Sequence, residues 1–300
     1  MEIKNFEELR EKIVISKKKT VAVVCAHDEH TLEAVLKAYE ENLLDYYLIG
    51  QKKEIIKKAE KVGFEIQTNR IVDCITDEES AKVAVHMAKE KKVDFIQKGL
   101  MQTSTLLKAV VNKESGIGKG TPMSHIALLD IPGYHKILGV TDGGMILYPD
   151  LEMKKAIIKN TAEMFRKAGY VKPKIAVVCA VEVENLKMPE TVDAGLLKKM
   201  ALTGEFGECY VDGPVSMDIA VDMEASRIKK YSSPVAGDTD IIVVPDITAG
   251  NIMVKGLLEF ADAKMAGIVT GAEVPIALNS RSASLEEKYY SLLACCFMAG

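Results

Sequence analysis

The chain has 300 residues, of which 48% are hydrophobic and 27% charged, and its formal net charge is −4. This is an ordinary globular composition, large enough for one or two domains whose cores need no disulfide or metal. Acidic and basic residues are mixed along the chain, so no basic stripe predicts nucleic-acid binding. No apolar run approaches the ~20 residues that span a bilayer, which excludes a membrane-spanning class.

The cysteines are spread along the chain and form no C-x-x-C pair. Without disulfide or zinc spacing, we expect a reducing, cytoplasmic environment and no metal site. The first residues, MEIKNFEELREK, are polar and predict a helix rather than a secretion signal. Cys25 and Cys179 lie inside apolar runs, so we expect both to be small buried hydrophobic residues.

Short apolar runs alternate with amphipathic stretches in the first third of the chain. Strands are expected at 20–26, 45–50, 70–74 and 93–99, and helices at 31–44, 51–63, 77–92 and from Thr103 onward. Fully apolar strands that alternate with helices favour a mainly parallel sheet with helices on both faces.

The middle of the chain differs, because residues 115–150 hold many Gly and Pro residues, but the alternation resumes after it. Strands are expected at 136–140, 172–182, 208–213, 239–246, 266–272 and 274–279, and helices at 151–169, 190–203, 216–229, 249–263 and from Ser284. We infer two α/β lobes that cross near residues 140–150 and 264–272. The first lobe comprises residues 1–142 plus 268–300, and the second comprises residues 143–267.

Polar or Gly-rich turns follow several of these strands, where ligands bind in open α/β sheets. The turns are Lys98-Gly99, Asp142-Gly143-Gly144, Asp212-Gly213-Pro214, Pro245-Asp246 leading to Asn251, and Asn279-Ser280-Arg281-Ser282. Such residues are common in α/β loops, so each turn has a structural alternative.

Lys98 is a candidate anion-binding residue, because it follows a buried strand and precedes a helix that starts near Thr103. The free N–H groups of that helix start also favour anions. The alternative is a solvated loop lysine. Ser124-His125 is a second candidate, in which the histidine donates to phosphate or to an acyl oxygen. A lone histidine more often is a strand-edge residue whose ring the backbone satisfies.

The segment SRSASLEE at 280–287 predicts a helix start, with Ser284 as N-cap and Glu287 at the capping-box position. The functional alternative is that Glu286 or Glu287 acts as a base beside Ser280 and Arg281. The planar guanidinium of Arg281 suits an oxyanion or a phosphate.

Taken in order, these turns resemble the phosphate acetyl/butyryltransferase family. The resemblance is carried by KGLMQT (98–103), SHI (124–126), TDGGMILYPDLEMK (141–154), VDGPVSMDIA (211–220), VPDITAGNIMVKG (244–256) and GAEVPIALNSRSASLEEK (271–288). The short chain and its SRSxS…EEK ending are more similar to the butyryl than to the acetyl enzymes.

The resemblance implies the two-domain α/β fold of isocitrate and isopropylmalate dehydrogenases, with the active site in the cleft between the lobes. It implies reversible acyl transfer, in which acyl-CoA and phosphate give acyl phosphate and CoA. Coenzyme A is then a substrate, no cofactor is permanently bound, and no metal takes part. The implied assembly is a homodimer or a larger assembly of dimers.

The resemblance also implies roles for particular residues. Ser280 contacts the CoA thiol, and Arg281 stabilises the carbonyl oxygen or phosphate. The acetyl enzymes place an Asp as base where this chain has Glu287, so the base is Glu287, Glu286 or no carboxylate at all. The residues expected to bind phosphate, acyl group or CoA are Lys98, Thr103, Ser124, His125, Asp142, Asp246 and Asn251.

Three alternatives remain at this point. One is an acetyl or branched-chain preference, because a methylene is worth only ~1–3 kcal/mol of discrimination. Another is a metal-dependent NAD(P) dehydrogenase of the same fold, with Asp142, Asp212 and Asp246 holding Mg²⁺. The third is a non-catalytic CoA-binding module, against which the Ser280-Arg281 pair argues.

Overall fold

The structure is a computed structural model that describes residues 2–14, 16–280 and 283–299. Its internal contacts divide the chain into two compact units. Unit 1 comprises Met1–Asn5 and Pro122–Lys264, and unit 2 comprises Phe6–Thr121 and Met265–Gly300. The lobe boundaries expected at residues 142 and 267 stay a prediction, because packing does not show which segments fold on their own.

Unit 2 contains a mainly parallel sheet in the order β3-β2-β1-β4-β11-β10. Neighbouring strands from β3 to β11 are parallel, and β10 is antiparallel to β11. The strands are β1 Lys19–Val24, β2 Leu44–Gly50, β3 Ile71–Asp73, β4 Phe95–Lys98, β10 Lys264–Thr270 and β11 Ile276–Ala277. The side chains of β1 and β4 are almost entirely buried, as a strand covered on both faces requires.

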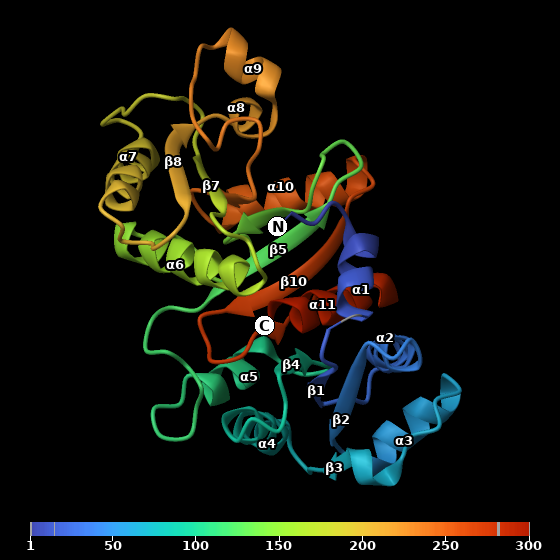
Figure 1. Ribbon diagram of the computed structural model, residues 1–300. Coiled ribbons are helices and arrows are strands. Elements are labelled where there is room, and N and C mark those ends of the chain that lie inside the picture. The colour runs from blue at the N-terminus through green and yellow to red at the C-terminus, as the bar shows by residue number, and fades with distance from the viewer. Residues whose placement is uncertain (1, 15, 281–282, 300) are drawn as a thin grey trace. The chain divides into compact units, whose positions relative to one another are not determined.

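The helices of unit 2 form two groups. One group packs around α11, which contacts α1 and α2, and the other is formed by α4 and α5. Figure 1 shows α11 and α4 on opposite sides of β4. The helices are α1 Phe6–Val14, α2 Glu29–Glu40, α3 Lys52–Lys61, α4 Asp77–Lys89, α5 Thr103–Val110 and α11 Leu285–Met298, with a 3₁₀ turn at Thr68–Arg70.

Unit 1 contains strands in the order β5-β6-β9-β7-β8. Here β6, β9, β7 and β8 are parallel, whereas β5 is antiparallel to β6. The strands are β5 Ser124–Asp130, β6 Leu138–Thr141, β7 Lys174–Val178, β8 Tyr210–Val215 and β9 Ile241–Val243. The helices are α6 Leu151–Lys167, α7 Pro189–Leu202, α8 Met217–Val221, α9 Met223–Ile228 and α10 Ile247–Phe260.

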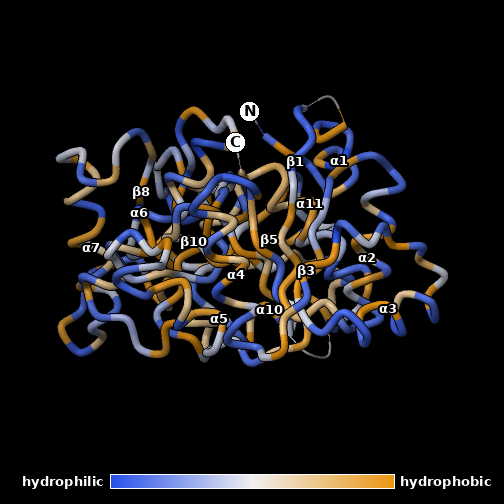
Figure 2. The backbone as a smooth tube through the Cα atoms, turned by 90° about the horizontal axis from the view of Figure 1, so that it is seen from below, coloured by the Kyte–Doolittle hydropathy of each residue, from blue (hydrophilic) through white to orange (hydrophobic). Residues whose placement is uncertain are grey.

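Helix ends follow from local sequence. Ser284 accepts a hydrogen bond from the N–H of Glu287 at 3.1 Å, which confirms the predicted N-cap. Asp150 and Thr76 cap α6 and α4 in the same way. Figure 2 shows hydrophilic and hydrophobic residues alternating along α3, as expected for a helix with one buried side. No helix in the described part of the chain is long and apolar enough to cross a membrane.

The predicted α/β class with mainly parallel strands is confirmed, and three details differ. The antiparallel strand β5 was not predicted. The expected helix at 216–229 is two helices, because Asp222 starts α9 by accepting from the N–H of Glu224 at 2.8 Å. Asp212 lies inside β8 rather than after it, and its buried carboxylate pairs with Lys198 at 2.7 Å. Cys25 and Cys179 are buried, as predicted.

Candidate functional site

A small hollow in unit 2 lies at the carboxyl ends of three adjacent parallel strands. The segments that follow β1, β4 and β11 contribute residues to its lining. Parallel strands end at the same edge of a sheet, so the polar residues that follow them are brought together there. The hollow is lined by Asp28, Lys98, Gly99, Leu100, Asn279, Ser280 and Lys288.

Lys98 is held inside this hollow and is only 5% exposed. Its Nζ donates to the carbonyl oxygens of Gly99 and Met101, each at 3.2 Å. The solvated-lysine alternative is therefore wrong. Gly99 is required here, because a Cβ at this position would lie 2.4 Å from the carbonyl oxygen of Cys25. The close approach of this loop to β1 thus fixes where the Lys98 ammonium lies.

A second lysine, Lys288, lies in the same hollow and is also buried. Its Nζ contacts the carboxylate of Asp28, and it donates to Thr31 Oγ1 at 3.0 Å. Burial raises the pKa of Asp28, but hydrogen bonds from Lys288 and Thr31 outweigh it, so this pKa lies below its ordinary value. Sequence reasoning missed both residues, although Lys288 closes the last of the family-like segments.

Glu287 and Glu286 have different surroundings. The Glu287 carboxylate is half-buried, and its Oε1 lies 3.3 Å from Nδ2 of Asn279. Burial raises the pKa of Glu287, against the opposing effects of Asn279 and Lys288. Glu286 is exposed and accepts a hydrogen bond from the Tyr290 hydroxyl at 2.8 Å. Of the two candidate bases, Glu287 is the one in a partly desolvated position.

Three further predicted residues of unit 2 have different outcomes. Ser280 is exposed and lines the hollow. Thr103 is half-buried in the first turn of α5 and does not belong to the lining. Arg281 lies outside the described residues, so its role stays a prediction.

In unit 1, Asp142 organises the turn that follows β6. Its Oδ2 accepts from the N–H of His125 at 2.9 Å, and its Oδ1 accepts from the N–H groups of Gly144 and Met145 at 2.9 and 2.8 Å. The carboxylate is 2% exposed, so backbone donors replace its water. Asp142 thus shapes the Gly-rich turn and fixes the start of β5 beside it.

The His125 ring packs directly on that turn. A Cβ at Gly144 would lie 2.8 Å from Nδ1 of His125, so only glycine leaves room for the ring. Burial lowers the pKa of His125, although Asp142 opposes this, so burial favours the neutral imidazole. Its Nδ1 is buried and has no hydrogen-bond partner among the described residues. The backbone of the described residues thus does not satisfy Nδ1, contrary to what the structural alternative expects.

The start of α10 meets the same turn. Asp246 caps α10, because its Oδ1 accepts from the N–H groups of Thr248 and Ala249 at 2.8 and 3.0 Å. Asn251 is exposed, and its Nδ2 donates to the carbonyl oxygen of Gly143 at 3.3 Å. His125, Asp142 and Asn251 therefore lie around the same Gly-rich turn.

Ser124 is the remaining predicted residue of unit 1. It is buried at the start of β5, and its Oγ lies 3.2 Å from Nδ2 of Asn160. Its place next to His125 brings a hydroxyl to the same edge of the strands. Its role in binding stays a prediction.

The dehydrogenase alternative needs free carboxylates for a metal. Asp142 and Asp246 accept backbone hydrogen bonds, and Asp212 pairs with Lys198. Within the described ranges, no group of three His, Cys, Asp or Glu side chains is placed to hold a metal ion. Each of the three aspartates therefore has its own partners in the fold, and they do not form one cluster of carboxylates.

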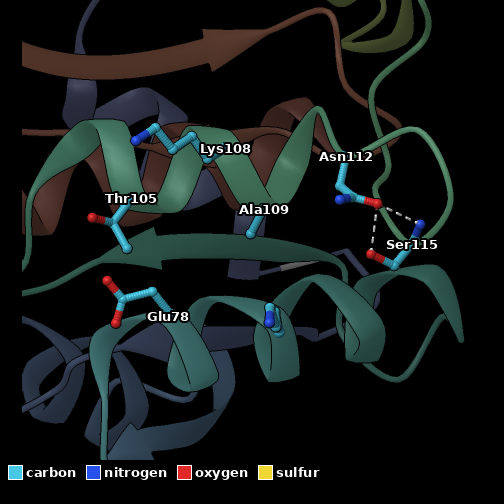
Figure 3. Close-up of a pocket in the computed structure, with 7 residues that line it drawn as sticks. Glu78, Thr105, Lys108, Ala109, Asn112 and Ser115 are labelled. Carbon is cyan, nitrogen blue, oxygen red and sulfur yellow. Dashed lines mark hydrogen bonds between the residues drawn. The ribbon is translucent and has the colours of Figure 1, made fainter.

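A larger pocket lies between α4 and α5, away from these residues (Figure 3). Thr105, Lys108 and Ala109 of α5 line one side and Glu78 of α4 the other, as Figure 3 shows. Asn112 Oδ1 closes its end by accepting from Ser115 N and Oγ at 3.0 and 2.9 Å. None of the predicted site residues lines this pocket.

Comparison with known proteins identifies the relatives of the chain. Residues 5–91 and 75–296 match the phosphate acetyl/butaryl transferase family. The chain belongs to this family. It is 39% identical over 298 residues to the phosphate butyryltransferase of Clostridium acetobutylicum, covering 99% of each chain. It is 41% identical to a probable phosphate butyryltransferase of Bacillus subtilis, covering 97% of each, and 38% identical to the phosphate acetyltransferase of Thermotoga maritima, covering 92% of this chain and 94% of the other.

Solved structures give the same result. A branched-chain phosphotransacylase from Enterococcus faecalis superposes with a TM-score of 0.82 at 32% identity, covering 94% of this chain and 99% of that one. A 4-hydroxythreonine-4-phosphate dehydrogenase from Salmonella typhimurium shares the fold at 15% identity, with a TM-score of 0.59 and coverage of 94% and 100%.

The family predicted from the sequence motifs is therefore confirmed. The chain is an acyltransferase that transfers an acyl group reversibly between coenzyme A and phosphate. The matched residues include those that line the hollow of unit 2 and also His125, Asp142 and Asn251 of unit 1.

Proposed function

We propose that the chain prefers a butyryl group, and that it makes butyryl phosphate and CoA from butyryl-CoA and phosphate, or the reverse. The preference is supported by the names of its relatives in Clostridium acetobutylicum and Bacillus subtilis. An acetyl or branched-chain preference is the alternative, since an acetyltransferase and a branched-chain phosphotransacylase are also similar to the chain.

The observation that carries the mechanism is the half-buried Glu287, whose carboxylate contacts Asn279, a residue that lines the hollow together with Ser280. Burial raises the pKa of Glu287, which makes its carboxylate a stronger base. In the direction of acyl-CoA synthesis, Glu287 takes the proton of the CoA thiol, next to Ser280. The thiolate attacks the carbonyl carbon of the acyl phosphate, and the carbon–oxygen bond to phosphate then breaks.

The charge that develops in this reaction needs donors. Arg281 stabilises the oxyanion of the tetrahedral intermediate, an effect typically worth ~3–4 kcal/mol. Lys98, Ser124 and His125 are proposed to bind the phosphate oxygens, and Thr103 to assist them. Asp142, Asp246 and Asn251 are proposed to shape the acyl and CoA site through the Gly-rich turn. In the reverse direction phosphate attacks the thioester, and Glu287 returns the proton to the departing thiolate.

Thiol release tests this function directly. The protein is mixed with phosphate and with butyryl-CoA, isobutyryl-CoA or acetyl-CoA, and free thiol is followed by absorbance. We expect release that requires phosphate and is fastest with butyryl-CoA. Faster turnover of another acyl-CoA would overturn the butyryl preference but keep the reaction. No phosphate-dependent release from folded protein would overturn the proposed mechanism.

The finer architectural predictions belong to the same proposal. We propose the two-lobed fold of isocitrate and isopropylmalate dehydrogenases, which the likeness to a 4-hydroxythreonine-4-phosphate dehydrogenase supports. A site built between the two lobes stays a prediction. We also propose that no cofactor is permanently bound and that the enzyme is cytoplasmic, which the six free cysteines support.

We propose a homodimer in which α10 packs against α10 of a second copy. Two large apolar residues are exposed on it, Ile252 at 67% and Phe260 at 92%, and nothing lies within 4 Å of a Cβ at Gly256 between them. In an antiparallel two-fold pair centred on Gly256, Ile252 of one copy faces Phe260 of the other. Lys255 and Glu259, one turn apart, then lie near their opposite charges in the partner, so the face is complementary to itself.

Light scattering after size-exclusion chromatography tests this dimer. Phe260→Glu is expected to shift the mass from dimer to monomer, because it buries a carboxylate against the apolar Ile252 of the other copy. Leu202→Glu, at a residue that is 81% exposed at the end of α7, is the matched control and should leave the mass unchanged. A Phe260→Glu protein that stays dimeric would contradict this interface, whereas a monomeric native chain would contradict the dimer itself.

A further inference from the structure

Asn279 stands between the hollow and the proposed base. It follows β11, precedes Ser280 and is buried. It also lines the hollow together with Lys98 and Lys288. None of the sequence arguments assigned it a role, because an Asn after a strand is common in α/β loops.

The Asn279 side chain joins its strand to the first turns of α11. Its Nδ2 donates to Ser291 Oγ at 2.8 Å and lies 3.3 Å from Glu287 Oε1. Ser291 Oγ donates in turn to the carbonyl oxygen of Glu287 at 2.8 Å and accepts from the N–H of Gly267 at 2.9 Å. Through Ser291, the amide is linked to β10 and α11. Its Nδ2 faces both the carboxylate and the backbone carbonyl oxygen of Glu287.

The acceptor half of the same amide is not used. Oδ1 of Asn279 is buried, with no hydrogen-bond partner among the described residues. A buried carbonyl without a donor costs about 1–3 kcal/mol. An apolar residue of similar size would avoid this cost, so packing alone gives no reason for an amide here. Its donor half, which reaches Ser291 and Glu287, is the part that the structure uses.

We propose that Asn279 is a positioning residue for Glu287, holding its carboxylate beside Ser280 and favouring its ionised form through the amide N–H. This inference rests on the proposed function, in which Glu287 accepts the thiol proton. A donor that contacts a carboxylate favours the charged state, which opposes the effect of burial. Asn279 thereby sets the lowest pH at which Glu287 acts as a base.

Other charged groups act on Glu287 as well. Lys288 follows it on α11 and lowers its pKa. Asp28 at the start of α2 pairs with Lys288 and offsets part of that charge. Lys98 at the end of β4 lines the same hollow, and Arg281 lies outside the described residues. Lys288 already has the Asp28 carboxylate as its partner. Asn279 is a neutral donor among the described residues that contacts the Glu287 carboxylate directly.

The test is the pH dependence of acyl-CoA synthesis from butyryl phosphate and CoA, followed by thioester absorbance. Two variants are compared with the native protein. Asn279→Ala removes the donor, and the nearly isosteric Asn279→Asp replaces it with a second carboxylate. We expect the acidic limb of kcat to shift to higher pH in both, further in Asn279→Asp, because a like charge raises the pKa of Glu287 more than loss of a donor.

At neutral pH we expect kcat to fall at least about tenfold, while KM for butyryl phosphate changes little. Unchanged pH profiles would overturn the proposal. So would a rise in KM with native kcat, since it would make Asn279 a substrate contact. Asn279→Asp keeps the test usable if Asn279→Ala does not fold.

A double-mutant cycle separates this inference from the function on which it rests. If Asn279 acts through Glu287, then Asn279→Ala should cost little more in a Glu287→Gln background. Full activity of Glu287→Gln alone would show that the assigned base is wrong. If Glu287→Gln is strongly impaired but the losses of the two variants add, the base is kept and only the role of Asn279 is overturned.

Discussion

Two adjacent glutamates show how position decides chemistry at the scale of single residues. Glu286 and Glu287 are equivalent in the sequence, where either one is a candidate base. The α-helical turn directs Glu286 outward to the Tyr290 hydroxyl and Glu287 inward to Asn279. Only Glu287 is partly desolvated, and burial raises its pKa toward the range that suits a general base.

Replacing each glutamate with glutamine separates the two. Glu287→Gln is expected to lower kcat by roughly 10²–10⁴-fold, the usual contribution of a general base. Glu286→Gln is the matched control, and it should retain nearly native kcat because Glu286 is exposed, as is its contact with Tyr290. Steady-state kinetics with butyryl phosphate and CoA measures both. A larger loss in Glu286→Gln would reverse the assignment.

The same carboxylate gives a prediction for stability. Its folded-state pKa is raised, so the folded protein holds this proton more tightly than the unfolded chain. The associated stability is present below the unfolded pKa of about 4.3 and is lost as pH rises through the folded value. Glu287→Gln should therefore have a higher Tm than the native protein at pH 7, with the difference shrinking toward pH 4. A lower Tm at pH 7 would contradict a destabilising ionised Glu287.

At the scale of elements, the site depends on how closely loops approach strands. The loop after β4 passes so near β1 that a Cβ at Gly99 would meet two backbone carbonyl oxygens, at 2.4 and 2.5 Å. Backbone atoms cannot move aside as flexible side chains do. The same reasoning applies to Gly143, where a Cβ would lie 2.8 Å from the carbonyl carbon of Gly250.

Gly99→Ala is therefore expected to destabilise the protein by about 1–3 kcal/mol, the usual cost of overpacking. It should also reduce activity, because it displaces the loop that holds Lys98. Gly133→Ala is the control, since no atom lies within 4 Å of a Cβ there and its backbone is not left-handed. Urea unfolding and thiol release measure the two effects. Equal stability of the two variants would contradict the close approach at Gly99.

At the scale of the molecule, the parallel strands of unit 1 carry candidate site residues at one end and a buried ion cluster at the other. Asp142 and Asp246 follow β6 and β9, at the carboxyl ends. At the amino ends, Lys136 Nζ lies 2.7 Å from a carboxylate oxygen of both Asp238 and Asp240 and is almost completely buried. This ion cluster ties together the starts of β6, β7 and β9 rather than facing the candidate site.

Lys136→Met is expected to destabilise the protein by about 3–5 kcal/mol, because it leaves the buried Asp240 carboxylate without its cation. Lys172→Met, which breaks the exposed pair with Glu208, should change stability little. Folded Lys136→Met should retain native kcat below its Tm. Loss of kcat without loss of Tm would contradict the structural role of the cluster.

The sequence by itself determined the positions of most elements, the α/β class and the family. Those properties depend on patterns within a few residues, such as the buried runs of β1 and β7, the Ser284 cap and the Ser280-Arg281 segment. Local patterns carry no information on strand direction, so the antiparallel pairing of β5 with β6 was not predictable from them.

Tertiary structure decided which polar residues meet and in which state. Lys288 and Asp28 are 260 positions apart in the chain, yet they share one hollow, and neither stood out in the sequence. The burial of Lys98, the lowered pKa of His125 and the raised pKa of Glu287 likewise come from distant contacts. Desolvation and hydrogen bonding depend on which surfaces the folded chain brings together, and for this reason only the three-dimensional arrangement distinguishes Glu287 from Glu286.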